Sequence, residues 1–148
     1  MNETIQIKRL RPEAKLPRRA TEGSAGLDLC ACLETPLTLA GGETAVIPTG
    51  LAIALPRNDL AAFIFARSGL AVKHGIGLLN SVGVIDSDYR GELCVGVINQ
   101  MHTPYTIAPG ERIAQLVVLP VAMLTPVEVD ALDETARGEG GFGSTGKV

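Results

Sequence analysis

Five stretches of this 148-residue chain place polar or charged side chains beside apolar runs, and these stretches are where the chain has the means for chemistry. They are Ser24–Leu29, Ala66–Leu70, Leu79–Gly91, Gly110–Leu116 and Arg137–Gly146. In the first stretch, Asp28 puts a carboxylate just inside a strand-like run. Taken by itself, Asp28 fits a turn-capping carboxylate better than a ligand group.

The second stretch combines a base, a hydroxyl and a glycine where a short helix is expected to start: Arg67, Ser68 and Gly69. Free N–H groups at a helix start bind anions, and serine and arginine side chains add donors. An ordinary N-cap at Ser68 beside a surface arginine explains the same residues equally well.

The third stretch has an acid directly after an apolar pair. Asn80–Gly83 is typical of a hairpin tip, and Val84 and Ile85 then lead to Asp86. A carboxylate in such a place can serve as the base that takes a proton from water. Two ordinary turn aspartates, Asp86 and Asp88, explain the pattern equally well.

The last two stretches add an amide and a glycine-rich tail. Gln115 lies in an apolar strand and needs hydrogen-bond partners, for which the backbone is the simplest source. In Arg137–Gly146, a glycine-rich backbone can wrap phosphates, with donors from arginine, serine and threonine. The ring of Phe142 is poorly placed for a core, but it can stack on a planar ligand, a contact worth about 1–3 kcal/mol.

Composition excludes several classes of protein. The net charge is −3, from 13 basic and 16 acidic residues, which disfavours nonspecific binding of nucleic acid. No apolar run is long enough to span a membrane, and the N-terminus lacks the apolar core of a signal peptide. Cys30, Cys32 and Cys94 have no zinc spacing, so we expect buried, reduced thiols in a cytoplasmic protein.

Charge is nevertheless uneven along the chain. The first 19 residues hold six bases and two acids, a net charge of +4, whereas the remaining 129 hold seven bases and fourteen acids, a net charge of −7. Such a basic segment can contact an anion, but a solvated N-terminal segment is the simpler prediction.

Short β-rich runs separated by Gly, Pro, Asn and Asp turns must position these side chains. The pattern predicts an all-β fold, such as a jelly roll, with one short helix at Ser68–His74. Two turns resemble each other, Ala40–Glu43 and Ala108–Glu111. We expect strands at Ile5–Leu10, Leu27–Cys32, Thr44–Ile47, Leu51–Leu55, Ala61–Ala66, Ile76–Leu79, Glu92–Asn99 and Arg112–Leu119. One β-domain over residues 1–129 and a flexible glycine-rich arm over 130–148 are predicted.

Taken in order and spacing, the five stretches resemble the five motifs of the trimeric deoxyuridine triphosphatases (dUTPases). The resemblance covers most of the chain and is most specific at Arg137–Gly146. It implies a jelly-roll distorted barrel and hydrolysis of dUTP to dUMP and pyrophosphate, which removes dUTP and supplies dUMP for thymidylate synthesis. It also implies a homotrimer with shared active sites, in which the arm of one chain closes over a neighbour's site. Mg²⁺ would be held mainly by substrate phosphates and waters.

The same resemblance assigns roles to the acid and the base-reading segment. Asp86 matches the carboxylate that orients and activates the attacking water. Tyr89 matches the ring beneath the deoxyribose, which excludes a 2′-hydroxyl. The groups matched to uracil recognition are Asn80 and the backbone of Val84, Ile85 and Cys94.

Phosphate contacts come from three further stretches in this comparison. Asp28 matches an acid near the metal that acts through water, so no direct protein ligand to the metal is expected. Phe142 matches the ring that stacks on uracil. The residues matched to phosphate and arm contacts are Arg67, Ser68, Gly69, Gln115, Arg137, Gly143, Ser144 and Thr145.

Two other functions fit parts of the pattern. A dCTP deaminase has a related trimeric fold but needs a different base-reading segment, and the sequence Gly141–Gly146 favours the pyrophosphatase. A nucleotide-responsive regulatory module without catalysis is the other alternative, against which the retained Asp86 argues. Ala66 and Val82 stand where the family often has proline, a difference in backbone stiffness rather than in chemistry.

Overall fold

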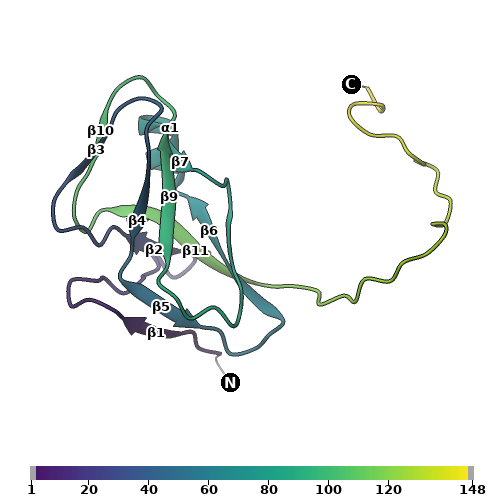
Figure 1. Ribbon diagram of the computed structural model, residues 1–148, viewed down its shortest axis with the longest axis horizontal. Helices are drawn as coiled ribbons and strands as arrows, with labels where there is room; N and C mark the ends of the chain where they lie inside the picture. Colours follow the sequence, from purple (N-terminus) through teal and green to yellow (C-terminus); the bar gives the residue numbers. More distant parts are fainter. Residues whose placement is uncertain (1–2, 147–148) are drawn as a thin grey trace.

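Eleven strands and one helix form the part of the chain that the computed structural model describes, residues 3–146 (Figure 1). The strands are β1 (Gln6–Arg9), β2 (Leu27–Cys30), β3 (Leu37–Leu39), β4 (Thr44–Pro48), β5 (Leu51–Ala54), β6 (Leu60–Ala66), β7 (Ile76–Leu78), β8 (Gly83–Ile85), β9 (Cys94–Asn99), β10 (Tyr105–Ile107) and β11 (Arg112–Pro120). The helix α1 (Ser68–His74) lies between β6 and β7. Residues 1–2 of the predicted domain and 147–148 of the predicted arm lie outside the described residues.

All strand pairs are antiparallel, which confirms the all-β prediction. A four-stranded sheet has the order β2-β11-β6-β8, and a three-stranded sheet has the order β4-β9-β7. Two further pairs, β1 with β5 and β10 with β3, complete the body. The only helix of residues 3–146 has seven residues, and none there is long and apolar enough to cross a membrane.

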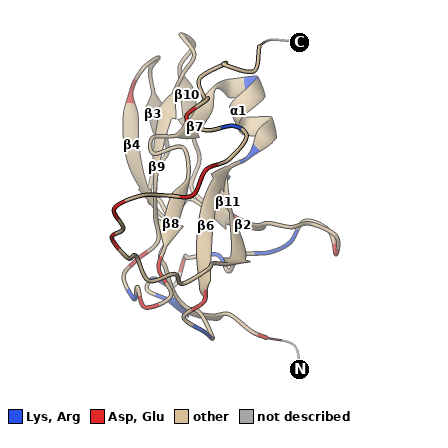
Figure 2. Cartoon of the chain, turned by 90° about the vertical axis from the view of Figure 1, so that its right-hand side faces the viewer, with Lys and Arg blue, Asp and Glu red and all other residues tan. Residues whose placement is uncertain are grey.

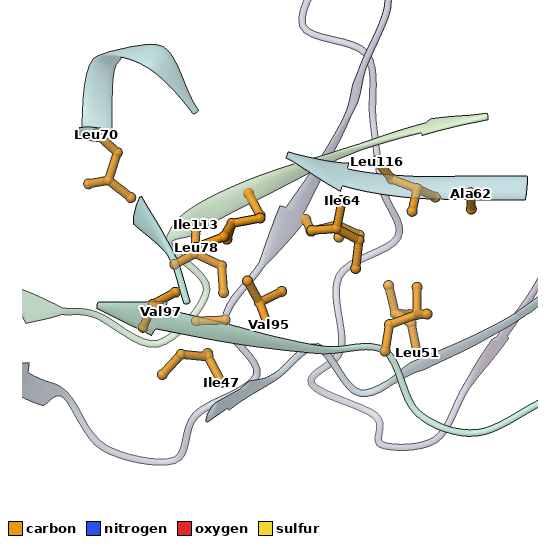
Figure 3. Close-up of a cluster of buried hydrophobic side chains, with 14 of the residues drawn as sticks. Ile47, Leu51, Ala62, Ile64, Leu70, Leu78, Val95, Val97, Ile113 and Leu116 are labelled. Carbon is orange, nitrogen blue, oxygen red and sulfur yellow. The ribbon is translucent and has the colours of Figure 1, made fainter. Parts of the chain in front are cut away.

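The core is aliphatic and fills the space between the two larger sheets (Figure 3). Ile64 and Leu116 approach it from the four-stranded sheet, and Ile47 and Val97 approach it from the three-stranded sheet. These strands alternate buried and more exposed residues over much of their length, as expected for sheets with one face on a core. The buried hydrophobic residues of 3–146 are all Ala, Val, Ile or Leu.

Three strands were not predicted from the sequence: β3, β8 and β10. Each has only three residues, too few to display an alternating pattern. The expected hairpin tip at Asn80–Gly83 is instead a turn between two sheets, because β7 pairs with β9 and β8 pairs with β6. In this turn the N–H of Val82 donates to the carbonyl of Asn80 at 2.7 Å, a bond that proline at position 82 could not make.

The helix has its predicted bounds, but the predicted N-cap is wrong. Arg67 is the N-cap, with an extended backbone (φ −88°, ψ 129°), and no side chain caps the helix. Ser68 is therefore the first helical residue, and its hydroxyl is not used in capping. Arg67 is the single residue between β6 and the helix, and its side chain contacts Asp28 instead of capping the helix. Gly75 ends the helix in the left-handed region, with φ 69°.

The two similar turns of the sequence have the same construction. Ala40 and Ala108 each donate their N–H to the carboxylate of the glutamate three residues later, both at 2.8 Å. Glu43 and Glu111 each return a backbone N–H to the alanine carbonyl, both at 3.1 Å. The turns directly follow β3 and β10, which pair with each other, so the repeated sequence closes both ends of one ribbon.

Tyr105 anchors this ribbon to the body. Its hydroxyl donates to Glu111, and its ring centroid lies 4.7 Å from that of His74 on α1. Burial, together with the hydrogen bond to Glu111, raises the pKa of the phenol to about 12. Tyr105 therefore stays protonated as a donor, and its ring has a structural role.

Beyond β11 the chain leaves the body as an extended arm (Figure 1). The last strand ends at Pro120, and residues 121–146 contain neither helix nor strand. Apolar side chains of the arm are exposed, among them Met123, Leu124, Val127 and Leu132. The predicted division at residues 129 and 130, and the flexibility of the arm, stay predictions.

Asn99 provides a test of the fold. Its buried side chain donates to the carbonyls of Leu39 and Thr103, at 3.0 and 2.9 Å, and accepts the N–H of Met101 at 3.0 Å. Asn99→Ala would leave these backbone groups without partners, so we expect the free energy of unfolding to fall by about 2–3 kcal/mol in urea denaturation. The exposed Asn58→Ala is the control and should change stability little. Equal stability of the two variants would contradict this role for Asn99.

Candidate active site

A small pocket gathers the residues of three separate sequence stretches. Asp28 comes from β2, Gln115 from β11, and Arg67, Ser68 and Gly69 from the junction of β6 and α1. The pocket has a volume of about 190 Å³. Ala20, Ser24 and Gly26 complete its lining. We call it the phosphate pocket, because its donors are those expected for phosphate oxygens.

Strand register explains why these residues meet. Asp28 pairs with Gln115, and Gln115 pairs on its other side with Phe65, two residues before Arg67. Paired residues of neighbouring antiparallel strands point to the same face. The side chains of Asp28 and Gln115 therefore share one face of the sheet, at the end where α1 begins.

The Asp28 carboxylate bridges two arginines. Its oxygens lie 3.2 Å from Nε of Arg67 and 3.0 Å from Nη1 of Arg112. Arg67 also donates from Nη1 to the carbonyl of Arg112 at 3.1 Å. Only 17% of the Asp28 side chain is exposed, so these pairs are partly shielded from water. The bridge fixes the direction of Arg67 at the rim of the pocket.

Sequence reasoning missed Arg112. The register of β11 against β2 shifts between Arg112 and Ala114, which is a β-bulge at Ile113. A bulge inserts one residue and redirects a side chain, and here it accompanies the contact of Arg112 with Asp28. The only sign of Arg112 in the sequence was a basic residue directly after the turn glutamate Glu111. The bulge that accompanies its contact with Asp28 cannot be recognised from the sequence.

Gln115 has the backbone partner that its burial requires. Its Nε2 donates to the carbonyl of Ala66 at 3.0 Å. Gly26 makes room for this side chain, because a Cβ at position 26 would lie 2.4 Å from Oε1 of Gln115. Because position 26 has no side chain, the Gln115 amide can lie in the lining of the phosphate pocket.

A second group of predicted residues lies on the other edge of the same sheet. Val84 and Ile85 belong to β8, which pairs only with β6 in the described part of the chain. The outer N–H and C=O groups of this edge strand are open to a ligand. Asp86 follows directly, is exposed, and takes part in none of the ion pairs found among residues 3–146.

Other residues of this group surround the edge. Asn80 is exposed, and its Nδ2 lies 3.7 Å from where a Cβ of Gly83 would be. Tyr89 donates its hydroxyl to the carbonyl of Glu92 at 3.0 Å and is 43% exposed. A Cβ at Gly91 would meet the Tyr89 hydroxyl at 2.3 Å, so glycine is what lets the ring lie over this loop.

Cys94 begins β9 and is exposed, and Cys30 and Cys32 are only partly buried. The prediction of buried thiols is therefore wrong, most clearly for Cys94, because β9 starts at the rim of the body rather than in its core. Partial burial and the neighbouring Glu92 raise the pKa of the Cys94 thiol. The three cysteines are free among the described residues.

The structure does not bring the first and second groups together within one chain. Ile85 pairs with Ala62, so the next residue, Asp86, lies at about the level of Ala61, near the start of β6. Asp28 and Gln115 lie at the level of Phe65, near the end of β6. Four residues of an antiparallel strand span about 14 Å. Asp86 and the phosphate pocket of the same chain are thus too far apart to act on one phosphorus atom.

The third group of predicted residues lies on the arm, away from the phosphate pocket and from the edge of β8. Phe142 is fully exposed, and its φ of 52° is unusual for a residue other than glycine. Gly143 follows with φ 89°. Arg137, Ser144 and Thr145 are also exposed, so no arm residue contributes to the phosphate pocket of its own chain.

Residues 3–146 contain no group of three His, Cys, Asp or Glu side chains placed to hold a metal ion. Asp28 is the single carboxylate of the phosphate pocket, and both of its oxygens face arginines. This donor set fits a Mg²⁺ ion whose ligands are mostly phosphates and waters, with Asp28 nearby.

Comparison with known proteins identifies the family. The family model for dUTPase matches residues 12–146. The chain belongs to the dUTPase family. A deoxyuridine 5′-triphosphate nucleotidohydrolase of Desulfitobacterium hafniense is 58% identical over 132 residues, which are 89% of this chain and 87% of that protein.

Solved dUTPase structures have the same fold. The dUTPase of Staphylococcus bacteriophage 80alpha, in a mutant form with dUpNHpp, gives a TM-score of 0.88 at 28% identity, over 98% of this chain and 99% of the other. The dUTPase of phage phi11 of S. aureus, which coordinates a structural Mg(II) ion, gives 0.77 at 24% identity over 86% and 97%. These likenesses confirm the predicted dUTPase jelly-roll fold.

Gly26→Ala tests the role of Gln115 in this dUTPase. The new methyl group would meet Oε1 of Gln115 at 2.4 Å and its Cβ at 3.0 Å, so the amide must leave the pocket lining and the free energy of unfolding should fall modestly. Loss of the amide from the pocket should weaken binding of dUpNHpp by about tenfold in isothermal titration calorimetry. Gly23→Ala is the matched control, since nothing lies within 4 Å of its Cβ. Unchanged affinity in Gly26→Ala would remove Gln115 from ligand binding.

Proposed function

We propose that the protein hydrolyses dUTP to dUMP and pyrophosphate, removing dUTP from the nucleotide pool and supplying dUMP for thymidylate synthesis. The observation that carries the proposal is the family match over residues 12–146, which includes all five stretches in full. Asp86, the residue on which catalysis would depend, is present and free of ion pairs among the described residues.

Hydrolysis requires a positioned water and a base. Asp86 accepts a proton from the water, whose oxygen forms a bond to the α-phosphorus. The bond from that phosphorus to the α,β-bridging oxygen breaks, and pyrophosphate leaves with the electron pair. Because attack is in line with the leaving group, the enzyme supplies orientation and charge rather than a covalent nucleophile.

Base selection is proposed to occur at the edge of β8. The open backbone groups of Val84 and Ile85, with the Asn80 side chain and the backbone of Cys94, read the uracil ring. The Tyr89 ring lies beneath deoxyribose and leaves no space for a 2′-hydroxyl. Backbone recognition suits this task, since an edge strand presents fixed donors and acceptors.

Phosphate binding is proposed for the phosphate pocket, through Arg67, Ser68, Gly69 and Gln115. Asp28 would hold Mg²⁺ through water at this pocket, because an acidic chain does not offset the charge of a triphosphate alone. When bound, the ion neutralises charge that develops on the phosphates. The ion pair with Asp28 orients the Arg67 guanidinium toward the bound phosphates.

We propose a homotrimer whose sites are shared. Within one chain, Asp86 is offset along the strands by about 14 Å from Asp28 and Gln115, which supports this arrangement because both groups must reach the α-phosphate. The arm supports it as well, since it extends away from the body of its own chain (Figure 1), and Arg137 and Phe142 are exposed on it. In the trimer, Phe142 would stack on uracil, and Arg137, Gly143, Ser144 and Thr145 would contact the outer phosphates.

The enzyme is proposed to work in the cytoplasm, with dUTP as its ligand and with neither nucleic acid nor membrane as a partner. The free cysteines of the described residues support this location.

Pyrophosphate release measured side by side on dUTP, dTTP, dCTP and UTP tests the activity. We expect turnover of dUTP far above the other three, because thymine adds a methyl group, cytosine changes the hydrogen-bonding edge and UTP adds a 2′-hydroxyl. Ammonia release from dCTP would instead indicate a deaminase. Binding of dUTP without pyrophosphate release would indicate a regulatory module.

Asp86→Asn tests the base. An amide cannot accept the proton of water, so the kcat for dUTP should fall by about 10²–10⁴-fold while dUpNHpp binding persists. The neighbouring exposed Asp88→Asn is the matched control, because it removes the same charge from the same turn. Normal turnover in Asp86→Asn would exclude Asp86 from the mechanism.

Complementation tests the shared sites. Asp86→Asn chains and chains ending at Thr135 should each be inactive, but subunit exchange between them should restore about a quarter of wild-type activity. Half of the chains then carry Asp86 and the other half carry the arm. Because a shared site takes the acid and the arm from different chains, about one site in four has both. Mixing just before the assay, without time for exchange, is the control. Persistent inactivity after exchange has been demonstrated by mass spectrometry would contradict shared sites.

A further inference from the structure

The basic N-terminal segment is exposed to solvent, as predicted, but it lies against the body, because β1 pairs with β5 and Arg18 forms a β-bridge with Asp28. Four of its bases, together with Arg112 of β11, line a pocket of about 540 Å³ beside β2. In Figure 2, basic residues lie along the loop that runs next to this strand. We call this the basic pocket, and its charged lining residues are Arg9, Lys15, Arg18, Arg19, Arg112 and Asp28.

The basic pocket is contiguous with the phosphate pocket. Asp28 and Ala20 line both, and the Asp28 carboxylate contacts Arg67 of one pocket and Arg112 of the other. An anion that leaves Arg67 on this side therefore meets Arg112 next. No comparable cluster of bases lines the other described pockets.

The charges of the basic pocket are poorly neutralised by the protein. Its lining contains five cationic side chains and one carboxylate. Lys15 donates to the carbonyl of Gly110 at 3.0 Å, and Arg19 donates to the carbonyls of Ser24 and Ala25 at 2.6 and 2.7 Å. Carbonyl oxygens orient these cations without cancelling their charge.

The side chains of two of these arginines have no hydrogen-bond or ion-pair partner among residues 3–146. Arg9 and Arg18 take part in none of the ion pairs or side-chain hydrogen bonds found there. Guanidinium groups bind phosphate oxygens with two parallel hydrogen bonds, and unpaired ones are the most available for this. In a protein with a net charge of −3, such a cluster concentrates anions locally.

The lining also indicates what kind of anion fits. It contains no aromatic ring, and its apolar members are Ala14, Leu16 and Ala20. A nucleotide base would find no ring to stack on. The chemistry therefore favours a bare polyphosphate.

We propose that the basic pocket is a second anion site, which binds inorganic pyrophosphate as it leaves the phosphate pocket. This rests on the proposed dUTP hydrolysis, which generates pyrophosphate on the far side of Asp28. Transfer along Arg67, Arg112 and Arg18 exchanges one set of charge-assisted hydrogen bonds for another. It frees the phosphate pocket for the next triphosphate before the product has reached solvent.

The test is calorimetric titration of the full-length protein with inorganic pyrophosphate and, separately, with dUpNHpp, both with Mg²⁺. In the Arg9→Gln, Arg18→Gln double variant, pyrophosphate affinity should fall by about tenfold or more, whereas dUpNHpp affinity should change by less than about twofold. The Arg9→Lys, Arg18→Lys variant should retain most of the pyrophosphate affinity, since it keeps the charge. Lys73→Gln, on α1, is the control for loss of an exposed base and should resemble wild type.

Two results would overturn the proposal. Unchanged pyrophosphate affinity in the glutamine variant would mean that pyrophosphate binds only in the phosphate pocket. A parallel fall for both ligands would mean that these arginines belong to the substrate site. Turnover of dUTP by the same wild-type preparation tests the proposed function separately, so failure of either idea is recognised without the other.

Discussion

The site depends on one carboxylate held between two guanidinium groups. Asp28 on β2 contacts Arg67 at the end of β6 and Arg112 at the start of β11, so a single charge ties together three strands of one sheet. Without it, two arginines would face each other at close range with nothing between them. Because breaking such a partly buried network costs more than an exposed pair, the geometry of Arg67 is fixed before any ligand arrives.

The order of that sheet, β2-β11-β6-β8, then decides how the chemistry is divided. The residues proposed to bind phosphate lie on β2, on β11 and at the end of β6, whereas the backbone proposed to read the base lies on β8 and the proposed acid, Asp86, follows it directly. The long strand β6 contacts both and separates them, because antiparallel pairing sends β8 toward its beginning. A rigid sheet cannot bend to close this distance, which supports the proposed sharing of sites between copies of the chain.

Much of the fold and of the candidate site could be predicted from the sequence, and there are physical reasons why the rest could not. Eight of the strands and the bounds of α1 follow from runs of β-branched and aliphatic residues between Gly and Pro turns, whereas β8 has too few residues for a pattern. Motif residues such as Gln115 could be named because a polar residue in an apolar strand is conspicuous. Arg112 could not, because its position depends on a bulge. The basic pocket was also hidden, since it joins a terminal segment to a strand about 90 residues away along the chain.

The glycine content of the arm has an energetic consequence. Five of the nine residues from Gly138 to Gly146 are glycine, the residue that loses most conformational entropy when it is ordered. At about 1–2 kcal/mol per residue, ordering this segment costs on the order of 10 kcal/mol, which stacking of Phe142 alone does not offset. On the proposed closure, the ordered arm persists only while one molecule presents both a base and an outer phosphate. Hydrolysis divides that molecule in two, so the chemical step itself removes the contacts that keep the arm ordered and releases the products.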